Sequence, residues 1–137
     1  MKKVIQHFAV AFLFVVSANT VAMSQTSSRA NDGVSPKEFQ AQWAHDNGFL
    51  MDIRTPEEYM AASISRAKLC SFNDQNFQAI LDMLDKGTPV YLYDQDGKNS
   101  AKAAEMMAKK GFKKFVVLEG GLDAWKKAGM EVLVMKK

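Results

Sequence analysis

The sequence predicts an α/β fold: a central, mainly parallel sheet of about five short strands with helices on both faces, in three layers. Two observations lead to this prediction. Short apolar segments alternate along the chain with segments of helical spacing, and each apolar segment is a continuous run rather than an in-out alternation. Such continuous runs are typical of parallel strands that helices cover on both sides.

The first 24 residues have the features of an export signal. Lys2 and Lys3 give a positive start, Phe8–Val16 is an uninterrupted apolar run of nine residues, and Ala22–Ser24 supplies small residues for cleavage. The apolar run is too short to span a bilayer comfortably, although an uncleaved anchor is the alternative. We therefore expect an exported protein, located in the periplasm if the source is a Gram-negative bacterium.

The chain is expected to divide into three parts. Residues 1–24 are the predicted signal peptide, and the polar residues 25–32 are a flexible lead-in. Residues 33–137 form one predicted domain, which is long enough for a single core.

The domain is expected to begin with a helix and a strand. Ser35–Glu38 has the pattern of a capping box with proline at the first helical position, and the helix should end near Asn47. Phe39 and Trp43 lie four residues apart on one face of this helix. The first strand is predicted at Phe49–Ile53.

A second capping box, Thr55–Glu58, predicts a short helix that reaches Ala62. A brief strand follows at Ala67–Cys70. The next helix is expected to be capped by Asn73 or Asp74 and to end at Gly87.

The central unit of the chain is a strand, a loop and a helix. Val90–Tyr93 is the strand, and Gly97 supplies the turn chemistry of the loop. Asn99 or Ser100 is expected to cap a helix that ends at Gly111. Such a loop directs backbone N–H groups inward at the positive end of a helix, which makes an anion cradle.

The chain closes with a strand at Phe115–Leu118, a turn at Gly120 and Gly121 that allows close backbone approach, and a helix at Leu122–Ala128. Met130–Met135 is expected to be a final short strand or an extended tail.

Acidic residues are expected at one edge of the sheet. Asp52, Asp94 and Glu119 come at or near the ends of three predicted strands. Because parallel strands end at the same edge, and ligand sites in such folds lie there, this edge is the candidate site.

The composition excludes several function classes. The net charge of +3 comes from 18 basic and 15 acidic residues, and removal of residues 1–24 takes away Lys2 and Lys3 and leaves about +1. This balance gives no electrostatic case for nucleic-acid binding. Cys70 is the only cysteine, and His7 and His45 are the only histidines, so we expect no disulfide within the chain, no metal site and no cofactor.

Residues 33–129 resemble the rhodanese-like (sulfurtransferase) family at three motifs in the same order. Residues 50–59 are similar to that family's Leu-Ile-Asp-Val-Arg-x-Pro-x-Glu-Tyr segment. Residues 63–67 stand where it usually has His-Ile-Pro-Gly-Ala, and residues 111–125 resemble its closing strand, Gly-Gly turn and helical tryptophan. The resemblance implies a rhodanese-like fold.

The loop departs from the family pattern. The family has Cys-Arg-x-Gly-x-Arg-Ser after the central strand, and this chain has the residues Asp94, Gln95, Asp96, Gly97, Lys98, Asn99 and Ser100. Only the glycine and the serine match. The resemblance implies that the sulfur-carrying cysteine is replaced by Asp94, so that no residue of this loop is a confident catalytic residue.

Asp94 changes what the loop can do. Sulfur transfer of the rhodanese type needs a thiolate that attacks sulfane sulfur and holds it as a persulfide. A carboxylate forms no stable persulfide, and Asp94 would place its own charge in the cradle. We therefore expect Asp94 to accept the N–H bonds of the loop, close it to thiosulfate, and leave a domain with a binding or regulatory role toward an unknown protein or a small anionic ligand.

Other interpretations remain open at this stage. Cys70 could be a displaced sulfur carrier or a small buried hydrophobe. Asp94 and Asp96 also resemble the first motif of haloacid-dehalogenase-type phosphatases, and the loop partly matches a calcium-loop register. Asp52 and Arg54 could form the rim of an anion site, or Asp52 could accept backbone bonds while Arg54 pairs with an acid such as Glu58.

Overall fold

The computed structural model describes residues 33–135, so the predicted signal peptide and lead-in lie outside the described residues. Four strands form one parallel sheet in the order β2-β1-β3-β4. The strands are β1 (Phe49–Asp52), β2 (Lys68–Leu69), β3 (Val90–Tyr93) and β4 (Phe115–Val117). The helices are α1 (Pro36–Asp46), α2 (Pro56–Ala61), α3 (Phe77–Met83), α4 (Lys98–Lys109) and α5 (Gly121–Lys127).

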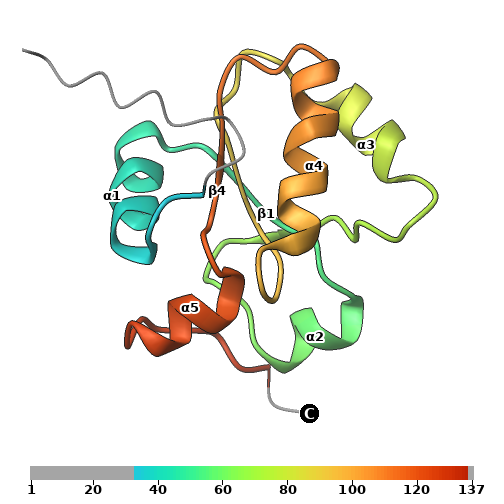
Figure 1. Ribbon diagram of the computed structural model, residues 1–137. Coiled ribbons are helices and arrows are strands. Elements are labelled where there is room, and N and C mark those ends of the chain that lie inside the picture. Colours follow the sequence, from blue (N-terminus) through green and yellow to red (C-terminus); the bar gives the residue numbers. More distant parts are fainter. Residues whose placement is uncertain (1–32, 136–137) are drawn as a thin grey trace, which may run out of the picture.

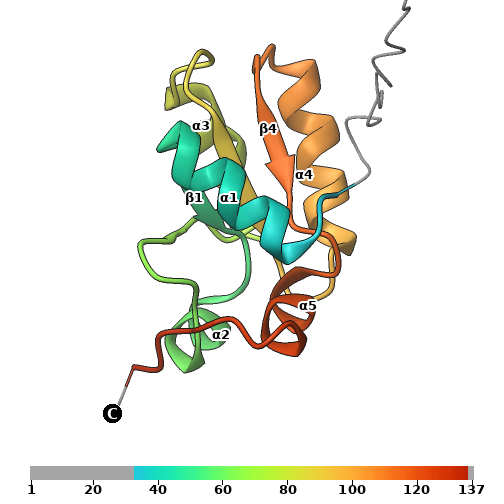
Figure 2. The ribbon, with the colours of Figure 1, turned by 90° about the vertical axis from the view of Figure 1, so that its left-hand side faces the viewer.

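Helices cover both faces of the sheet, which confirms the predicted three-layer α/β fold. Figures 1 and 2 show α3 and α4 on one face and α1 with α5 on the other. The central strand β3 contributes Val90 and Leu92 to the first core and Tyr91 and Tyr93 to the second. All four side chains are fully buried, which is why this strand is apolar at every position.

Of the two alternatives predicted for Met130–Met135, the structure has a tail rather than a fifth strand. The segment around Leu133 makes a single antiparallel bridge to Ser63 and is otherwise irregular. At the other edge, Val34 makes one parallel bridge to Leu118. The sheet therefore has four strands rather than about five, with short bridges at its margins.

Capping boxes were predicted at the starts of α1 and α2, and only the one at α2 forms. Thr55 forms the expected capping box with Glu58. Ser35 makes no side-chain cap bond, and the carboxylate of Glu38 accepts a hydrogen bond from Gln42 at 3.0 Å rather than from the backbone of Ser35. The capping box predicted at Ser35 is therefore wrong, although the helix starts at Pro36 as expected.

Helix α3 is shorter than predicted. It begins at Phe77 without a side-chain cap, and Asp74 accepts the N–H of Asn76 in the preceding turn at 2.7 Å. It ends at Met83 rather than Gly87, since Leu84 already has extended backbone with ψ of 140°, and the Lys86 ammonium folds back onto the final carbonyls, including that of Leu84 at 2.9 Å. A cation at these carbonyls satisfies acceptors that another helical turn would otherwise use.

Helix α4 begins before its predicted caps. Its first residue is Lys98 and its N-cap is Gly97, with φ of 96°, so Asn99 and Ser100 lie in the first turn and do not cap it. The end at Gly111 is as predicted, with φ of 81° there. Within the described residues, no helix is both long enough and apolar enough to cross a membrane.

Candidate functional site

The candidate site lies where β1 and β3 end and α4 begins. Asp94 follows β3 directly, and the loop after it is held in place by the start of α5. Leu122 donates its N–H to the carbonyl of Asp94 at 2.8 Å, and Asp123 donates to that of Gln95 at 3.1 Å. The loop is therefore fixed by backbone bonds before any ligand is considered.

Gly121 permits this contact between α5 and the loop. A Cβ atom at this position would lie 2.5 Å from the carbonyl oxygen of Asp94 and 2.6 Å from that of Gln95. Its φ is also positive, at 60°. The predicted close backbone approach at the glycine pair is confirmed, and it occurs against the candidate site.

Asp94 occupies the anion cradle with its own carboxylate. Its Oδ1 accepts the N–H of Gly97 at 2.7 Å and the hydroxyl of Ser100 at 2.8 Å. Its Oδ2 accepts the N–H of Asn99 at 2.8 Å and that of Ser100 at 3.3 Å. The expected loop bonds to Asp94 are confirmed, and the side chain is only 3% exposed.

The same bonds explain why α4 starts early. The first N–H groups of a helix have no partner within the helix and need an outside acceptor. Here the acceptor is the carboxylate of Asp94, which serves Asn99 and Ser100 together. Asp94 thus acts as an N-terminal cap from outside the helix, and its negative charge lies where the helix dipole favours it.

Asp52 and Arg54 form a buried pair below the loop. Arg54 Nη2 and Nε donate to the two carboxylate oxygens of Asp52 at 2.7 and 3.0 Å, and the backbone N–H of Arg54 also donates to Asp52 at 3.0 Å. The expected backbone bond to Asp52 is confirmed. The predicted pairing of Arg54 with a nearby acid is confirmed, but that acid is Asp52 rather than Glu58, whose carboxylate serves the capping box of α2.

The guanidinium of Arg54 has little capacity left for a ligand. Besides Asp52, it donates to the carbonyl of Ala62 at 2.6 Å and to Oε1 of Gln95 at 3.0 Å, and it lies over the ring of Tyr93. Burial lowers the pKa of Arg54, but the bond to Asp52 outweighs it and leaves the pKa raised. Arg54 therefore keeps its charge, and its donors serve contacts within the protein rather than a ligand.

Gln95 connects the loop to this pair. Its Oε1 accepts from Arg54, and its Nε2 donates to Asp123 at the start of α5. Asp96 is exposed and accepts the N–H of Lys98 at 3.1 Å. This hydrogen bond, and to a smaller extent the contact with the Lys98 ammonium, lowers the pKa of Asp96. Asp96 therefore stays ionised at the mouth of the site.

A hollow of about 190 Å³ opens above these residues. Three carboxylates line it, those of Glu58, Asp94 and Asp96, against the single guanidinium of Arg54. The other lining residues are Ile53, Thr55, Asn73, Gln95 and Asn99. The hollow is therefore net negative by about two charges on this lining, which disfavours a small free anion.

A family model described as a rhodanese-like domain matches residues 35–128. The chain belongs to the rhodanese-like domain family. Among solved structures, a rhodanese-related protein from Thermoplasma volcanium is similar with a TM-score of 0.65 at 19% identity, over 76% of this chain and 98% of that one. The fold predicted from the resemblance is thereby confirmed.

Two other proteins are similar in sequence to this chain, one a named enzyme and one uncharacterised. Thiosulfate sulfurtransferase GlpE of Vibrio cholerae is 25% identical over 68% of this chain and 86% of its own length. Uncharacterized protein slr1261 of Synechocystis sp. is 29% identical over 81% of this chain. The matched region spans 61% of slr1261, so part of that relative has no counterpart in the match.

Cys70 lies outside the hollow of this rhodanese-like domain. It is 7% exposed and packs in the core that α3 and α4 share with the sheet, beside Met51 and Ile53. Burial, and then the charge of Asp52, raises the pKa of the Cys70 thiol. This supports the interpretation of Cys70 as a small buried hydrophobe and weakens that of a displaced sulfur carrier.

The metal-based interpretations find no support in the geometry. Both oxygens of Asp94 are already used as hydrogen-bond acceptors by the loop. Among residues 33–135, no three histidine, cysteine, aspartate or glutamate side chains group as metal ligands. Glu119 is exposed and lies outside the lining of the hollow.

Two features of the site could not be found in the sequence. The bond between Arg54 and Gln95 joins residues 41 positions apart, and the Tyr93 hydroxyl accepts the N–H of Ile64 at 3.0 Å across 29 positions. Burial, and then the charge of Asp52, raises the pKa of Tyr93, so its hydroxyl stays protonated. No local pattern marks such partners, because they meet only when neighbouring strands pair.

Proposed function

We propose that this protein is an exported rhodanese-like domain that has lost sulfur transfer and acts by binding a protein partner or a small ligand. The observation that carries the proposal is the position of Asp94, whose carboxylate takes four hydrogen bonds in the loop that would otherwise cradle an anion. A site whose donors are already used offers few interactions to a second anion.

Charge supports the same proposal. The hollow presents Glu58, Asp94 and Asp96, whereas Arg54 is neutralised by Asp52. An anionic sulfur donor such as thiosulfate would approach three carboxylates in a confined space, where like charges repel more strongly than in bulk water. Neither of the two loop arginines that the family resemblance leads one to expect is present, since Gln95 and Asn99 stand there.

The chemistry of Asp94 is the third support. In sulfur transfer a thiolate attacks the outer sulfur of thiosulfate, sulfite leaves, and the sulfur stays on the protein as a persulfide until an acceptor removes it. The oxygen of a carboxylate is a hard, weak nucleophile and holds no stable sulfur adduct. The domain therefore keeps the scaffold of a sulfurtransferase without its sulfur carrier.

The export part of the proposal depends on residues 1–24 alone. Their positive start, apolar run and small residues near the cut are the sequence features of a signal peptide. Fusion of residues 1–30 to a reporter that is active only outside the cytoplasm tests this part separately.

The experiment for the site compares wild type with Asp94→Cys in a thiosulfate:cyanide assay. We expect no thiocyanate from wild type, and formation of bound sulfur in the variant, seen by intact mass as the addition of one sulfur atom. Asp96→Cys is the matched control, because it places a thiol two residues further on, exposed and outside the cradle. Thiocyanate formation or bound sulfur in wild type would contradict the proposal.

A sulfurtransferase that works through Cys70 is the second candidate, favoured by the likeness to thiosulfate sulfurtransferase GlpE. If wild type turns over, Cys70→Ser tests this candidate, because Cys70 is the only cysteine of the chain. Loss of turnover in that variant would identify Cys70 as the carrier, whereas retained turnover would exclude a thiol of this chain as the carrier.

A further inference from the structure

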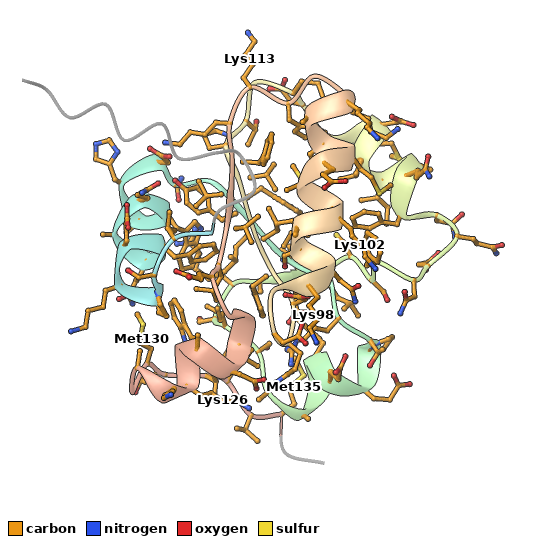
Figure 3. The ribbon with its side chains drawn as sticks, in the orientation of Figure 1. Lys98, Lys102, Lys113, Lys126, Met130 and Met135 are labelled. Atoms are coloured by element: carbon orange, nitrogen blue, oxygen red, sulfur yellow. The ribbon has the colours of Figure 1, made fainter. Side chains whose placement is uncertain are left out.

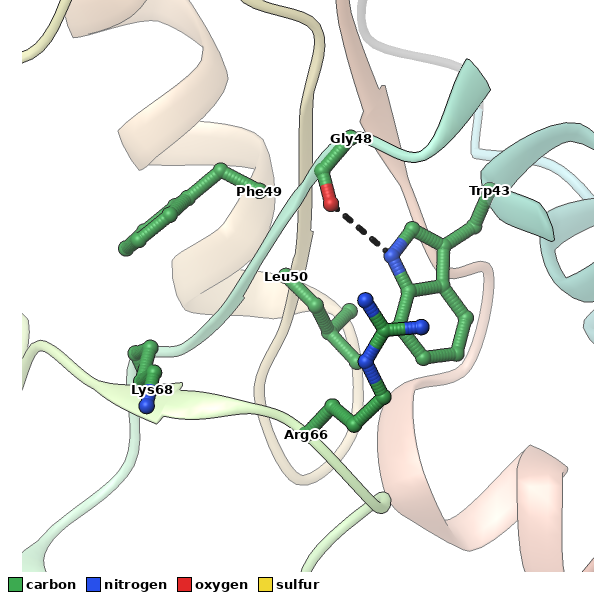
Figure 4. Close-up of a pocket in the computed structure, with 6 residues that line it drawn as sticks. All are labelled: Trp43, Gly48, Phe49, Leu50, Arg66 and Lys68. Atoms are coloured by element: carbon green, nitrogen blue, oxygen red, sulfur yellow. Dashed lines mark hydrogen bonds between the residues drawn. The ribbon is translucent and has the colours of Figure 1, made fainter. Parts of the chain in front are cut away.

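A second hollow lies at the end of the sheet where the strands begin, opposite the end that carries the Asp94 loop. It has a volume of about 380 Å³ and opens where β1 and β2 begin, beside the end of α1. Figure 4 shows its lining, which consists of Trp43, Gly48, Phe49, Leu50, Arg66 and Lys68. The volume falls in the range of small-molecule sites, about 300–1,000 Å³.

The charge of this hollow is opposite to that of the first. Arg66 and Lys68 are its charged residues, both are exposed, and its lining contains no carboxylate. Neither forms an ion pair with another described residue. The nearby Asp46 is held by the ammonium of Lys114 and the hydroxyl of Tyr91, so its charge is already compensated.

Trp43 gives the hollow a rigid aromatic wall. Its Nε1 donates to the carbonyl of Gly48 at 3.0 Å, which fixes the orientation of the indole (Figure 4). Gly48 has no room for a side chain, because a Cβ would lie 2.7 Å from both the carbonyl of Pro89 and the ring of Tyr91. The wall is therefore preformed, which lowers the entropy that a ligand would have to overcome on binding.

Arg66 is positioned against this wall. Its guanidinium carbon lies 5.5 Å from the centroid of the Trp43 ring, and Nη2 donates to Oδ1 of Asn47 at 3.3 Å. These contacts use a small part of the guanidinium, which carries five N–H donors. The remaining donors are available to an anionic group, whereas Lys68, in register with Met51, lies on the other face of the sheet.

The backbone of Arg66 adds an independent observation. Its φ is 68°, in the left-handed region that an arginine seldom adopts and glycine adopts freely. Strained non-glycine residues of this kind are concentrated at functional sites. The Arg66 side chain is thus held at the hollow at a cost in stability. Among the described residues, its one hydrogen bond to another side chain, that of Asn47, gives little in return.

We propose that this hollow binds a small organic anion, with its carboxylate, sulfonate or phosphate group on the free donors of Arg66 and its apolar body beside Trp43 and Leu50, which lie on the same face of the sheet (Figure 4). The guanidinium pairs with planar anions in two-point contacts, and the indole next to it offers apolar surface. This site is separate from the Asp94 loop, so the two proposals can fail independently.

The test is a titration of the full chain with naphthalene-1-sulfonate, followed by NMR. The chain has two tryptophans, so two indole N–H signals are available. The signal of Trp43 should shift saturably, whereas that of Trp125, which is buried and donates to the carbonyl of Glu131, should not. Naphthalene-1-methanol, which lacks the charge, should bind at least about tenfold more weakly.

Two variants test whether the binding depends on Arg66. Arg66→Gly should weaken naphthalene-1-sulfonate about tenfold while remaining folded, because glycine suits the left-handed backbone. Lys68→Ala removes a neighbouring charge on the other face of the sheet and should weaken binding much less. Lys102→Ala on α4, an exposed residue outside the lining of the hollow (Figure 3), is the control for net charge and should bind like wild type.

Three results would overturn the proposal. The first is the absence of a saturable shift of the Trp43 signal. The second is equal binding of naphthalene-1-sulfonate by wild type and Arg66→Gly, which would place the ligand elsewhere. The third is equal affinity for the neutral alcohol, which would show an apolar crevice without anion recognition.

Discussion

The carboxylate of Asp94 offers the sharpest test of how this loop is held. Asp94→Ala removes the acceptor of four hydrogen bonds, three from backbone N–H groups and one from the Ser100 hydroxyl. The substitution changes no other residue of the loop, so the loss of stability should report mainly on the vacated donors.

The magnitude follows from the surroundings of each donor. The N–H of Ser100 is buried, and a buried donor left without a partner costs about 1–3 kcal/mol. Those of Gly97 and Asn99 are partly buried, next to the hollow, and can bond to water at a net loss of about 0.5–1 kcal/mol each. The free energy of unfolding should therefore fall by about 3 kcal/mol.

Urea denaturation followed by circular dichroism measures this loss. For a domain of this size each kcal/mol corresponds to roughly 4–8 °C in Tm, so the thermal midpoint should fall by about 15 °C. Asp96→Ala is the matched control, since its exposed carboxylate accepts one backbone N–H and pairs with exposed Lys98. It should lose much less stability than Asp94→Ala, because exposed ion pairs contribute little.

Sulfate should partly repair Asp94→Ala, because the vacated donors again form an anion cradle. At a sulfate concentration ten times the dissociation constant, the gain is about 1.4 kcal/mol. Sodium chloride of matched ionic strength and wild type in the same sulfate correct for general salt effects. The reasoning is refuted if Asp94→Ala is as stable as wild type, or if sulfate stabilises both proteins equally.

Three further predictions concern the packing and the charges around the site. Gly121→Ala should lower the free energy of unfolding, measured in urea, by more than about 3 kcal/mol, because the new Cβ would meet the backbone of the loop. Gly111→Ala is the control: its φ is also positive but the space around it is open, so it should lose only about 1 kcal/mol. Equal losses in the two variants would contradict this explanation. The bonds from Lys114 and then Tyr91 lower the pKa of Asp46 below its ordinary value of 3.8, so the stability due to this carboxylate is present above about pH 4 and is lost as the pH falls below that value. Asp46→Asn should therefore flatten the acid limb of a pH–stability profile, and an unchanged limb would refute the assignment. The Cys70 thiol should resist iodoacetamide in the native protein and react in urea, since it is 7% exposed with a raised pKa; rapid native alkylation would show that it is accessible.

Local patterns were sufficient to predict the order of the elements. The continuous apolar run of β3 predicted a strand buried on both faces, because every side chain of such a strand must be apolar. The capping box at Thr55 and the glycine pair at Gly120 and Gly121 were also readable, since each depends on residues within a few positions of one another. The same holds for the motifs that indicated the family.

Predictions failed where several nearby side chains compete for the same group. The start of α4 was misplaced because Asp94 caps it from outside the helix. The partner of Arg54 was misassigned because Asp52 lies closer in the folded strand end than Glu58, which is engaged by Thr55. In both cases several chemically suitable partners exist, and only the fold selects among them.

The sequence by itself determined the layered α/β architecture, the family, and the acidic residue Asp94 directly after the central strand, because these depend on periodicity, turn chemistry and residue identity. Only the tertiary structure decided that the Asp94 carboxylate fills the cradle, that Cys70 faces the core, and that Arg66 lies over Trp43. These are distances between side chains on different elements, and such distances are fixed by how the helices and strands pack rather than by their order along the chain.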